Sequence, residues 1–552
     1  MDEEFLFLTP SFDNLSDFQE MFEYLYTGLI KRIDGDRPTI DSKITSYRKF
    51  LQDRYIPDQG KKWEYVFNDY ISMFQNAVIW QAPGAMINVT PPANIPSIIA
   101  AFFAMLFNPN FATDESTGFL TSTELIVIKY LAQLVHWDKN NYGGLFTFGG
   151  KGTNLYALQM GLREACPKVK KDGIFSDQYI VFTNDKAHPC HIEVAEWMGL
   201  GSNSVCVLPT TKSGQVNLEI FEKQMREAIH SKKKIACIYL NGGSTNEGFI
   251  DPIYEVVQIR DRIVEEYQLT YKPHIHVDAV IGWVWLFFKS YDFEKNSLKM
   301  NSVEIKKVQS ICSKIREIEY ADSFGADFHK MGFCPYVSSA FVVRNSSVLE
   351  CSWHCTYSKK EDMYWGEYTP FEYSLELTRS SIGPVSAFIT LELLGIQGFQ
   401  KLIYKVFSAG EVIRSIIKSN DEFEVINEET EGFATLFVVK PPGEAIQYKE
   451  IIRQNIESIN SFVEYNHQFY LFVQNAYNKK KIRTKITFSR SYKPYGSLYK
   501  TGALKIYQMS PIVSTSDWNT YIQEIIDLKK EYDSSNTQLS EPYKIPKDMV
   551  YK

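Results

Sequence analysis

Short apolar runs alternate with longer helical segments from about residue 120 onward. The runs that we expect to be strands are residues 179–183, 205–209, 236–240, 274–278, 321–327 and 339–344. Runs that are apolar on both faces and separated by helices are typical of a mainly parallel sheet covered by helices. The pattern therefore predicts an α/β fold. In such folds, ligands bind at the carboxyl ends of the strands.

The chain on either side of this region has a different pattern. The first hundred residues are helical and rich in aromatics, and residues 95–107 form an apolar run that we expect to be a buried helix, too short to span a bilayer. Beyond about residue 385 a long helix is followed by runs at 433–440, 469–475 and 485–491, which we expect to be strands. The predicted organisation is an N-terminal helical segment, 1–110, a large domain, 111–395, and a small α/β domain, 396–552.

Composition narrows the class of protein. The 552 residues are 44% apolar and carry a formal net charge of −7, which favours a folded protein and speaks against nucleic-acid binding as the main function. The N-terminus shows no basic and apolar leader, so we expect a cytoplasmic protein without a membrane partner. Cysteine and histidine cluster at 188–191 and 351–355, but neither cluster has paired metal-ligand spacing, and we predict no metal.

A glycine-rich segment is the first candidate for chemistry. An apolar run enters Gly149-Gly150-Lys151-Gly152-Thr153, and a helical segment leaves it. Glycines let backbone N–H groups approach an anion, and the dipole at a helix N-terminus favours negative charge. The segment is a candidate phosphate cradle, although a simple glycine-rich turn explains the same letters equally well.

Charged and polar residues close the other apolar runs. Asp278 ends the run HIHVD, where a carboxylate is either structural or the partner of a protonated ring nitrogen. Lys330 follows His329 at the end of another run; burial there would lower the pKa of its amine and make it a nucleophile, whereas a solvated loop lysine is the commoner case. His188 can stack on a planar cofactor or be an ordinary partly buried histidine, and Thr245 lies in a turn after a further run.

The order of these features resembles the group II amino-acid decarboxylases that use pyridoxal phosphate and have fold type I. The match extends from about residue 80 to 400, and its most specific motifs are HVDA at 276–279 and ADSFGADFHKMG at 321–332. The phosphate loop departs from the family, which commonly has serine where Lys151 stands. The resemblance implies a large domain with a seven-stranded sheet, and a homodimer with active sites shared between subunits.

The resemblance also implies roles for individual residues. Lys330 would hold the cofactor as a Schiff base, Asp278 would keep its pyridine nitrogen protonated, and His188 would stack on the ring. A tyrosine of the loop after the lysine would protonate the product carbon, with Tyr357 favoured over Tyr364 and Tyr368. The full set implied to bind pyridoxal phosphate is Gly150, Lys151, Gly152, Thr153, His188, Thr245, Asp278, His329 and Lys330.

The expected reaction is decarboxylation of an L-amino acid to an amine and carbon dioxide, through an external aldimine and a quinonoid. An aromatic substrate is favoured because the segment HKMGFCPY at 329–336 is similar to that of bacterial tyrosine decarboxylases. An acidic amino acid remains an alternative, as do a carbon–carbon lyase and an oxidative, aldehyde-forming enzyme. A non-catalytic scaffold is the last alternative, and the presence of both Lys330 and Asp278 argues against it.

Overall fold

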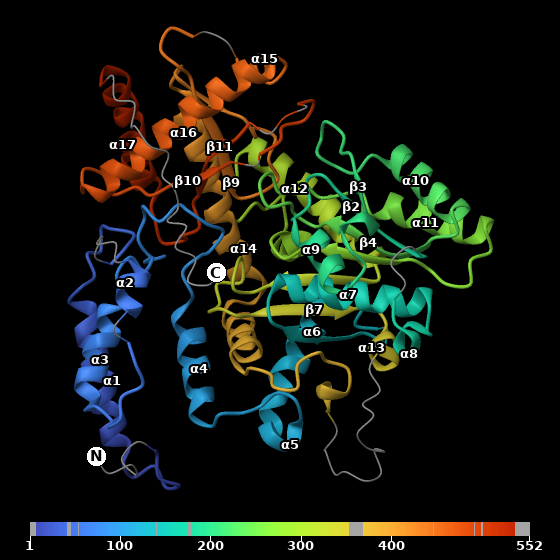
Figure 1. Ribbon diagram of the computed structural model, residues 1–552, viewed down its shortest axis with the longest axis horizontal. Coiled ribbons are helices and arrows are strands. Elements are labelled where there is room, and N and C mark those ends of the chain that lie inside the picture. Colours follow the sequence, from blue (N-terminus) through green and yellow to red (C-terminus); the bar gives the residue numbers. More distant parts are fainter. Residues whose placement is uncertain are drawn as a thin grey trace.

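The computed structural model describes residues 7–535 apart from 41–45, 53, 140, 175–177, 353–367, 445–446, 491, 498 and 500. Its chain forms three parts (Figure 1): N-terminal helices at one side, a central α/β body, and a C-terminal α/β body above it. The class predicted from the sequence, α/β with a large sheet and a smaller C-terminal sheet, is confirmed.

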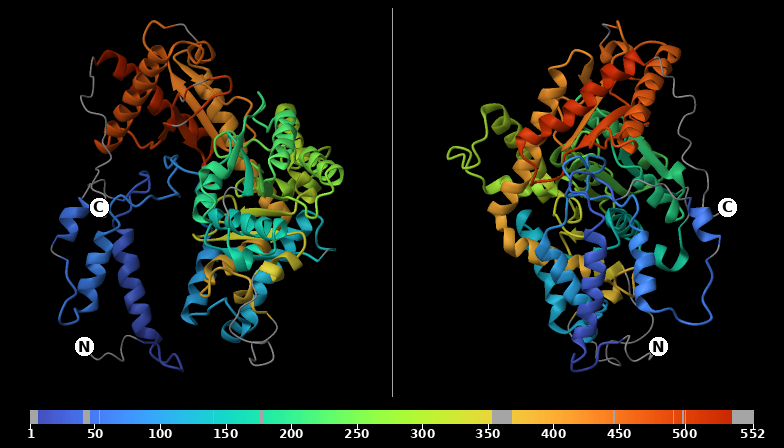
Figure 2. Two further views of the ribbon diagram at one scale, coloured as in Figure 1. Left: turned by 45° about the vertical axis from the view of Figure 1, so that its right-hand side comes forward. Right: turned by 90° about the vertical axis from the view of Figure 1, so that its left-hand side faces the viewer.

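The N-terminal part consists of α1 (Leu15–Ile30), α2 (Tyr47–Leu51), α3 (Trp63–Ser72) and α4 (Ile95–Leu106). Helices α1 to α3 stand beside the central body rather than on it (Figures 1 and 2), and α1 has no buried residue. Asn94 begins α4 as its N-cap, with its side chain accepting from the backbone N–H of Ser97. The expected helix over 95–107 is present, but the expectation that it is buried is wrong for the single chain, since the Phe103 side chain is 56% exposed.

The central body is built on a seven-stranded sheet of order β1-β7-β6-β5-β4-β2-β3. Among strands β2 to β6, every neighbouring pair is parallel, as predicted. The seven strands are β1 (Gly143–Thr147), β2 (Tyr179–Asn184), β3 (Val205–Leu208), β4 (Lys234–Asn241), β5 (His274–Asp278), β6 (Ser323–Asp327) and β7 (Ser339–Val343).

Helices cover both faces of this sheet, which explains why its strands are apolar on both sides. On one face lie α7 (Gly150–Ala165) and α9 (Cys190–Trp197). The other face is covered by α6 (Ser122–Leu134), α10 (Leu218–His230), α11 (Ile253–Glu266), α12 (Ser302–Ile315) and the 3-10 helix Gly282–Ser290. Short helices α5 (Asp114–Thr117), α8 (Val169–Asp172) and α13 (Ser347–Ser352) complete the body.

Strand β7 is antiparallel to both of its neighbours, β1 and β6. Its first residue, Ser339, therefore pairs with the last residue of β6, Asp327. The segment between these two residues carries Lys330 and leaves and re-enters the sheet at the same edge. This edge is the one where the parallel strands have their carboxyl ends.

The C-terminal body has a four-stranded antiparallel sheet of order β10-β11-β9-β8. Its strands are β8 (Phe423–Val425), β9 (Ala434–Val439), β10 (Thr487–Ser489) and β11 (Ala503–Tyr507), with helices α15 (Tyr448–Ile451), α16 (Ile456–Asn478) and α17 (Thr515–Ser534). The strand expected at 469–475 is wrong, because these residues belong to α16. Its buried positions Phe469 and Val473 are four residues apart, which is a helical spacing. Because the residues between them are also mostly apolar, this spacing is not evident from the sequence.

Helix α14 (Ile382–Lys418) joins the central and C-terminal bodies. Gly395, at φ 53°, kinks it, and the expected domain boundary at 395/396 falls at this kink; the domain division itself stays a prediction. Among the described residues α14 alone is long and apolar enough to cross a bilayer. Its residues Phe399, Ile403, Val406 and Phe407 are buried in the main hydrophobic core, which is the pattern of an internal helix.

Candidate active site

A cavity opens at the carboxyl edge of the central sheet. The lining residues come from the ends of β4, β5 and β6, from the segments after β2, β4, β5 and β6, and from the starts of α7 and α9: Gly150, Lys151, Asn154, His188, Cys190, Asn241, Gly243, Ser244, Thr245, Asp278, Val280, Ile281, Asp327, His329 and Lys330. The two residues on which the sequence interpretation depends, Asp278 and Lys330, therefore share one cavity. Segments far apart in the chain meet there because parallel strands end at the same edge.

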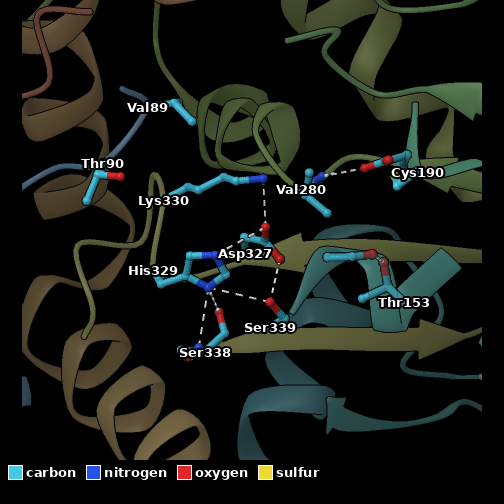
Figure 3. Close-up of polar contacts among 12 residues, drawn as sticks. Val89, Thr90, Thr153, Cys190, Val280, Asp327, His329, Lys330, Ser338 and Ser339 are labelled. Carbon is cyan, nitrogen blue, oxygen red and sulfur yellow. Dashed lines mark hydrogen bonds and ion pairs between the residues drawn. The ribbon is translucent and has the colours of Figure 1, made fainter. Parts of the chain in front are cut away.

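Lys330 reaches into this cavity from the turn after β6. Its Nζ lies 2.8 Å from Oδ2 of Asp327, a carboxylate that is 1% exposed, and Figure 3 shows the amine pointing toward it. Burial alone would lower the pKa of Lys330, but the carboxylates of Asp327 and Asp278 outweigh it and hold the pKa above its ordinary value. The expectation that burial gives this amine a lowered pKa is thus wrong, because the two carboxylates reverse the direction of the shift.

Asp278 is the last residue of β5 and is buried. Its Oδ2 accepts from Nδ2 of Asn154 and from Nε2 of His191, each at 3.1 Å. Burial alone would raise the pKa of Asp278, but the hydrogen bond from His191 and the charge of Lys330 outweigh it and hold the pKa well below its usual range. Asp278 is therefore an ionised carboxylate in a buried place, suited to a cationic partner such as a protonated ring nitrogen.

The glycine-rich segment forms the turn from β1 into α7. Gly149, at φ 125°, lies in a region that favours glycine, and Gly150 and Lys151 line the cavity at the N-terminus of α7. An anion there meets a helix dipole and free backbone donors. The amine of Lys151 pairs with Glu193 on α9 and lies 5.0 Å from the Trp197 ring.

Gly152 and Thr153 lie behind this turn rather than at the cavity. Their backbone N–H groups donate to the carbonyl of Gly149 at 2.8 and 3.4 Å, and the Thr153 hydroxyl donates to the carbonyl of Gly150 at 2.7 Å. A Cβ on Gly152 would come within 2.1 Å of the Thr147 hydroxyl. These contacts give both residues a packing role in the turn, and their part in binding phosphate stays a prediction.

The remaining predicted residues surround the cavity. His188 presents an exposed ring, whose Nδ1 accepts from the backbone N–H of Cys190 at 3.1 Å. His329 is buried, with Nδ1 2.9 Å from the carbonyl of Ser338 and its ring 4.2 Å from that of Tyr336. Thr245 lines the cavity from the turn after β4, and its carbonyl accepts from the Tyr507 hydroxyl of the C-terminal body at 3.2 Å.

Tyr357 and Tyr364, two of the three tyrosines considered as proton donors, lie outside the described residues. Tyr368 is described and is partly buried, with its hydroxyl donating to Oε2 of Glu124 at 3.1 Å. Burial raises the pKa of Tyr368 well above its usual value. This tyrosine contacts α6 through Glu124, and it is not among the residues that line the cavity.

Several residues of the site carry no clear signal in the sequence. Asn154 is buried, its Oδ1 has no hydrogen-bond partner in the structure, and its Nδ2 donates to Asp278. Asn241 likewise carries no signal, and the sequence marks Cys190 and His191 only as members of a cysteine–histidine cluster, whereas Asp327 lies inside the motif that contains Lys330. A search for polar side chains one helical turn after the glycines would have found Asn154, four residues beyond Gly150.

Cys190, His191 and Asp278 bring three possible metal-ligand atoms within 4.8 Å of one another. Both ring nitrogens of His191 already have partners, Asp278 at Nε2 and the Thr183 hydroxyl at Nδ1. An imidazole bound in this way has no lone pair directed at a metal. The cluster is better explained as a hydrogen-bonded support for Asp278.

Pyridoxal phosphate fits the residues of this cavity. Lys330 offers an amine, Asp278 offers a buried carboxylate that requires a cation, and the start of α7 offers donors for a phosphate. The fold and the site together thus define a pyridoxal-phosphate enzyme of fold type I. The model of the pyridoxal-dependent decarboxylase conserved domain matches residues 46–440, and the chain belongs to that family.

Comparisons with individual proteins agree with this assignment. The chain is 23% identical to the acidic amino acid decarboxylase GADL1 of Xenopus tropicalis over 95% of this chain and 94% of that protein. The human protein of the same name is 23% identical over 79% and 75% of the two chains. Among solved structures, apo mouse CSAD superposes with a TM-score of 0.75 at 18% identity, covering 94% of this chain and 99% of that one. Oryza sativa TDC with pyridoxal phosphate and tryptamine gives 0.74 at 14%, covering 95% and 99%. The chain is accordingly a pyridoxal-phosphate-dependent carboxy-lyase.

Proposed function

We propose that this decarboxylase acts on an acidic L-amino acid, with an aromatic substrate as the second candidate. Relatives over nearly the whole chain are named acidic amino acid decarboxylases, although at 23% identity. The observation that carries the proposal is a cation beside the cavity, Lys505 on β11. Its Nζ is 3.0 Å from Oδ1 of Asn246, the residue after Thr245 in the turn that borders the cavity.

Lys505 is suited to receive a carboxylate. Burial lowers its pKa to about 8, against the raising effect of Glu247, so the amine is still mainly protonated at neutral pH. Its Nζ contacts the neutral Asn246 amide and lies 5.0 Å from the centroid of the Tyr507 ring. A partly desolvated cation with neutral partners attracts a substrate carboxylate more strongly than one that is already paired.

The support for an aromatic substrate is weaker than the sequence suggested. In the segment HKMGFCPY, the side chains of Met331, Phe333 and Cys334 are buried in the hydrophobic core. None of the three is among the residues that line the cavity. Similarity in these letters therefore reflects how the lysine turn is packed, and it says little about the substrate side chain.

The residues of the chain divide the work of the reaction. When bound, pyridoxal phosphate supplies the electron sink that accepts the electron pair left by the departing carboxylate. Lys330 would hold the cofactor, and Asp278 would keep a proton on its pyridine nitrogen. His188, whose exposed ring lines the cavity, would lie against the cofactor ring, and Gly150 and Lys151 would hold the phosphate. Tyr357 would return a proton to the product carbon.

A homodimer belongs to the same proposal. Three aromatic side chains on or directly after α1 and α4 are half or more exposed in the single chain: Phe22, Phe103 and Phe107. Exposed apolar side chains on these N-terminal helices favour cover by a second copy. The N-terminal helices would then complete the partner's active site.

A substrate panel tests the proposal. Purified protein loaded with pyridoxal phosphate is given acidic and aromatic L-amino acids, and amine and carbon dioxide are measured beside aldehyde and hydrogen peroxide. We expect amine and carbon dioxide from an acidic substrate and no turnover in Lys330→Ala. Lys505→Met should raise KM for the acidic substrate, and Lys505→Arg, which keeps the charge, should raise it less. Turnover of aromatic substrates alone, or aldehyde with peroxide as the products, would contradict it.

A further inference from the structure

His191 forms a connected set of buried contacts behind Asp278. It is the second residue of α9 and is completely buried. Its Nε2 lies 3.1 Å from Oδ2 of Asp278, and its Nδ1 lies 2.8 Å from the hydroxyl of Thr183. Its ring is stacked on that of Tyr239, with centroids 4.4 Å apart and planes at 15°. Position, tilt and both nitrogens of the imidazole are therefore fixed.

The two oxygens of Asp278 differ in their surroundings. Oδ2 accepts from His191 and from Asn154, so it is satisfied from within the protein. Oδ1 accepts one long bond, 3.4 Å, from the backbone N–H of Val280. A carboxylate oxygen has capacity for further donors. Because Asp278 lines the cavity, Oδ1 is the oxygen that remains for a donor inside it.

We propose that His191 is a positioning residue, which donates from Nε2 to Oδ2 of Asp278 and thereby directs Oδ1 at the protonated pyridine nitrogen of the cofactor. Thr183 takes part by donating its hydroxyl to Nδ1, which leaves the proton of the neutral imidazole on Nε2. The sequence gives His191 no role beyond a cysteine–histidine cluster. The inference concerns cofactor binding, so it does not depend on which amino acid is the substrate.

A purely structural role for His191 predicts something different. A buried histidine that only fills space would affect folding, and its loss would leave the cofactor ring unchanged in any variant that folds. A positioning role predicts a change at the pyridine nitrogen even in a variant with normal stability. The experiment must therefore observe the ring nitrogen and the stability separately.

Two amide substitutions separate the two hydrogen bonds. The amide nitrogen of glutamine in His191→Gln falls near the place of Nε2 and can still donate to Asp278. That of asparagine in His191→Asn falls near Nδ1, so it retains the Thr183 contact and loses the Asp278 contact. His274→Gln is the matched control: His274 is buried on the same strand as Asp278, and its partners are Glu164 and Ser323.

Each protein is reconstituted with pyridoxal phosphate labelled with 15N in the ring. The 15N shift reports protonation of the ring nitrogen, a fluorescence titration gives the dissociation constant, and thermal unfolding of the apo protein gives the stability. In wild type, His191→Gln and His274→Gln we expect a protonated ring nitrogen. His191→Asn should shift it toward the unprotonated form and weaken binding by about tenfold to a hundredfold, the range for losing a hydrogen bond to a charged group.

An unchanged ring-nitrogen shift and dissociation constant in folded His191→Asn would overturn the proposal. Thr183→Val replaces a hydroxyl by a methyl group of similar size, and it tests the role of His191 if His191→Asn does not fold. It should weaken binding by about three- to tenfold because the Nε2 proton is no longer fixed. Wild-type affinity and ring protonation in Thr183→Val would then refute the role of His191. None of these readouts requires turnover, so a wrong substrate assignment would leave them intact.

Discussion

The buried ion pair between Glu124 and Arg379 makes the sharpest prediction about how the cofactor loop is held. Glu124 lies on α6, and Arg379 precedes α14; their side chains are 0% and 4% exposed. Oε1 of Glu124 accepts from Arg379 Nη2 and from the backbone N–H of Phe146 at 2.6 Å, and Oε2 accepts from Arg379 Nη1 at 3.0 Å. Arg379 in turn donates to the carbonyl of Phe146 at 2.9 Å. The backbone N–H and the carbonyl of Phe146, which precedes the glycine turn on β1, thus both depend on the ion pair.

Glu124→Gln retains the shape and removes the charge. The buried guanidinium then lacks its counter-ion. The new amide NH₂ is itself a donor, so it cannot accept from the N–H groups that the carboxylate oxygen had accepted from. Removing one partner of a buried ion pair costs about 3–5 kcal/mol. The entropy of unfolding grows with chain length, so 1 kcal/mol corresponds to about 1 °C for a chain of 552 residues, and the apo protein should lose roughly 3–5 °C in its unfolding midpoint. Affinity for pyridoxal phosphate should fall as well, because the strand before Gly149 loses its anchor.

Thermal unfolding of the apo protein and a cofactor titration measure the two effects. Arg379→Met should be destabilised to a similar degree. The double variant should lose clearly less than the two single losses together, since neither charge is then left alone. Glu193→Gln is the control. Its ion pair with Lys151 is partly exposed, at 46% and 35% of the two side chains, so the substitution should change stability by less than about 1 kcal/mol. A Glu124→Gln protein as stable as wild type, or strict additivity in the double variant, would refute the reasoning.

Three further predictions follow from single contacts. Gly152→Ala places a Cβ 2.1 Å from the Thr147 hydroxyl and should lower the free energy of unfolding by about 1–3 kcal/mol. Gly60→Ala is the control and should not lower it, because no atom lies within 4 Å of the added Cβ. Equal shifts in the melting temperatures of the two variants would contradict the prediction. Burial raises the pKa of Cys312 and Cys334 to about 12, while contacts with Tyr179 and nearby backbone, against burial, lower that of Cys166. Iodoacetamide mapping at pH 8 should therefore find Cys166 modified first of these three, and early labelling of Cys334 would be inconsistent. Burial also lowers the pKa of His276 to about 3 from the usual 6.5. The unfolded chain therefore binds a proton at this histidine more readily than the folded protein does. The free energy of unfolding should fall as the pH drops from 6.5 toward 3, by about 1.4 kcal/mol per pH unit. Urea unfolding at pH 6.5, 5.5 and 4.5 should show a shallower fall in His276→Asn, and equal slopes would exclude the assignment.

The sequence was most informative where local order sets the structure. Apolar runs that end in Asp278 and in the Lys330 motif correspond to strands β5 and β6, and parallel strands bring their ends to one edge. The α/β class, the cofactor and the cavity shared by these residues could therefore be predicted. The glycine turn before α7 was also placed correctly by its composition.

The sequence was less informative where side chains from separate elements meet. Asn154, Thr183 and His191 belong to α7, β2 and α9, and no spacing in the chain shows that they converge on Asp278. The pKa of Lys330 depends on its contact with the carboxylate of Asp327, and the sequence alone does not show this contact. For residues 469–475, apolar composition alone did not distinguish a strand from the middle of α16.

The antiparallel direction of β7 has a consequence for how the chain finds its fold. The pairing of Asp327 with Ser339 closes a hairpin within one short stretch of sequence, so the loop-closure entropy for placing the lysine turn is small. Bringing Asp278 beside it requires a crossover that includes α12, which is a slower, less local step. The lysine turn can thus be ordered early in folding, while the cavity forms only when β5 docks against β6.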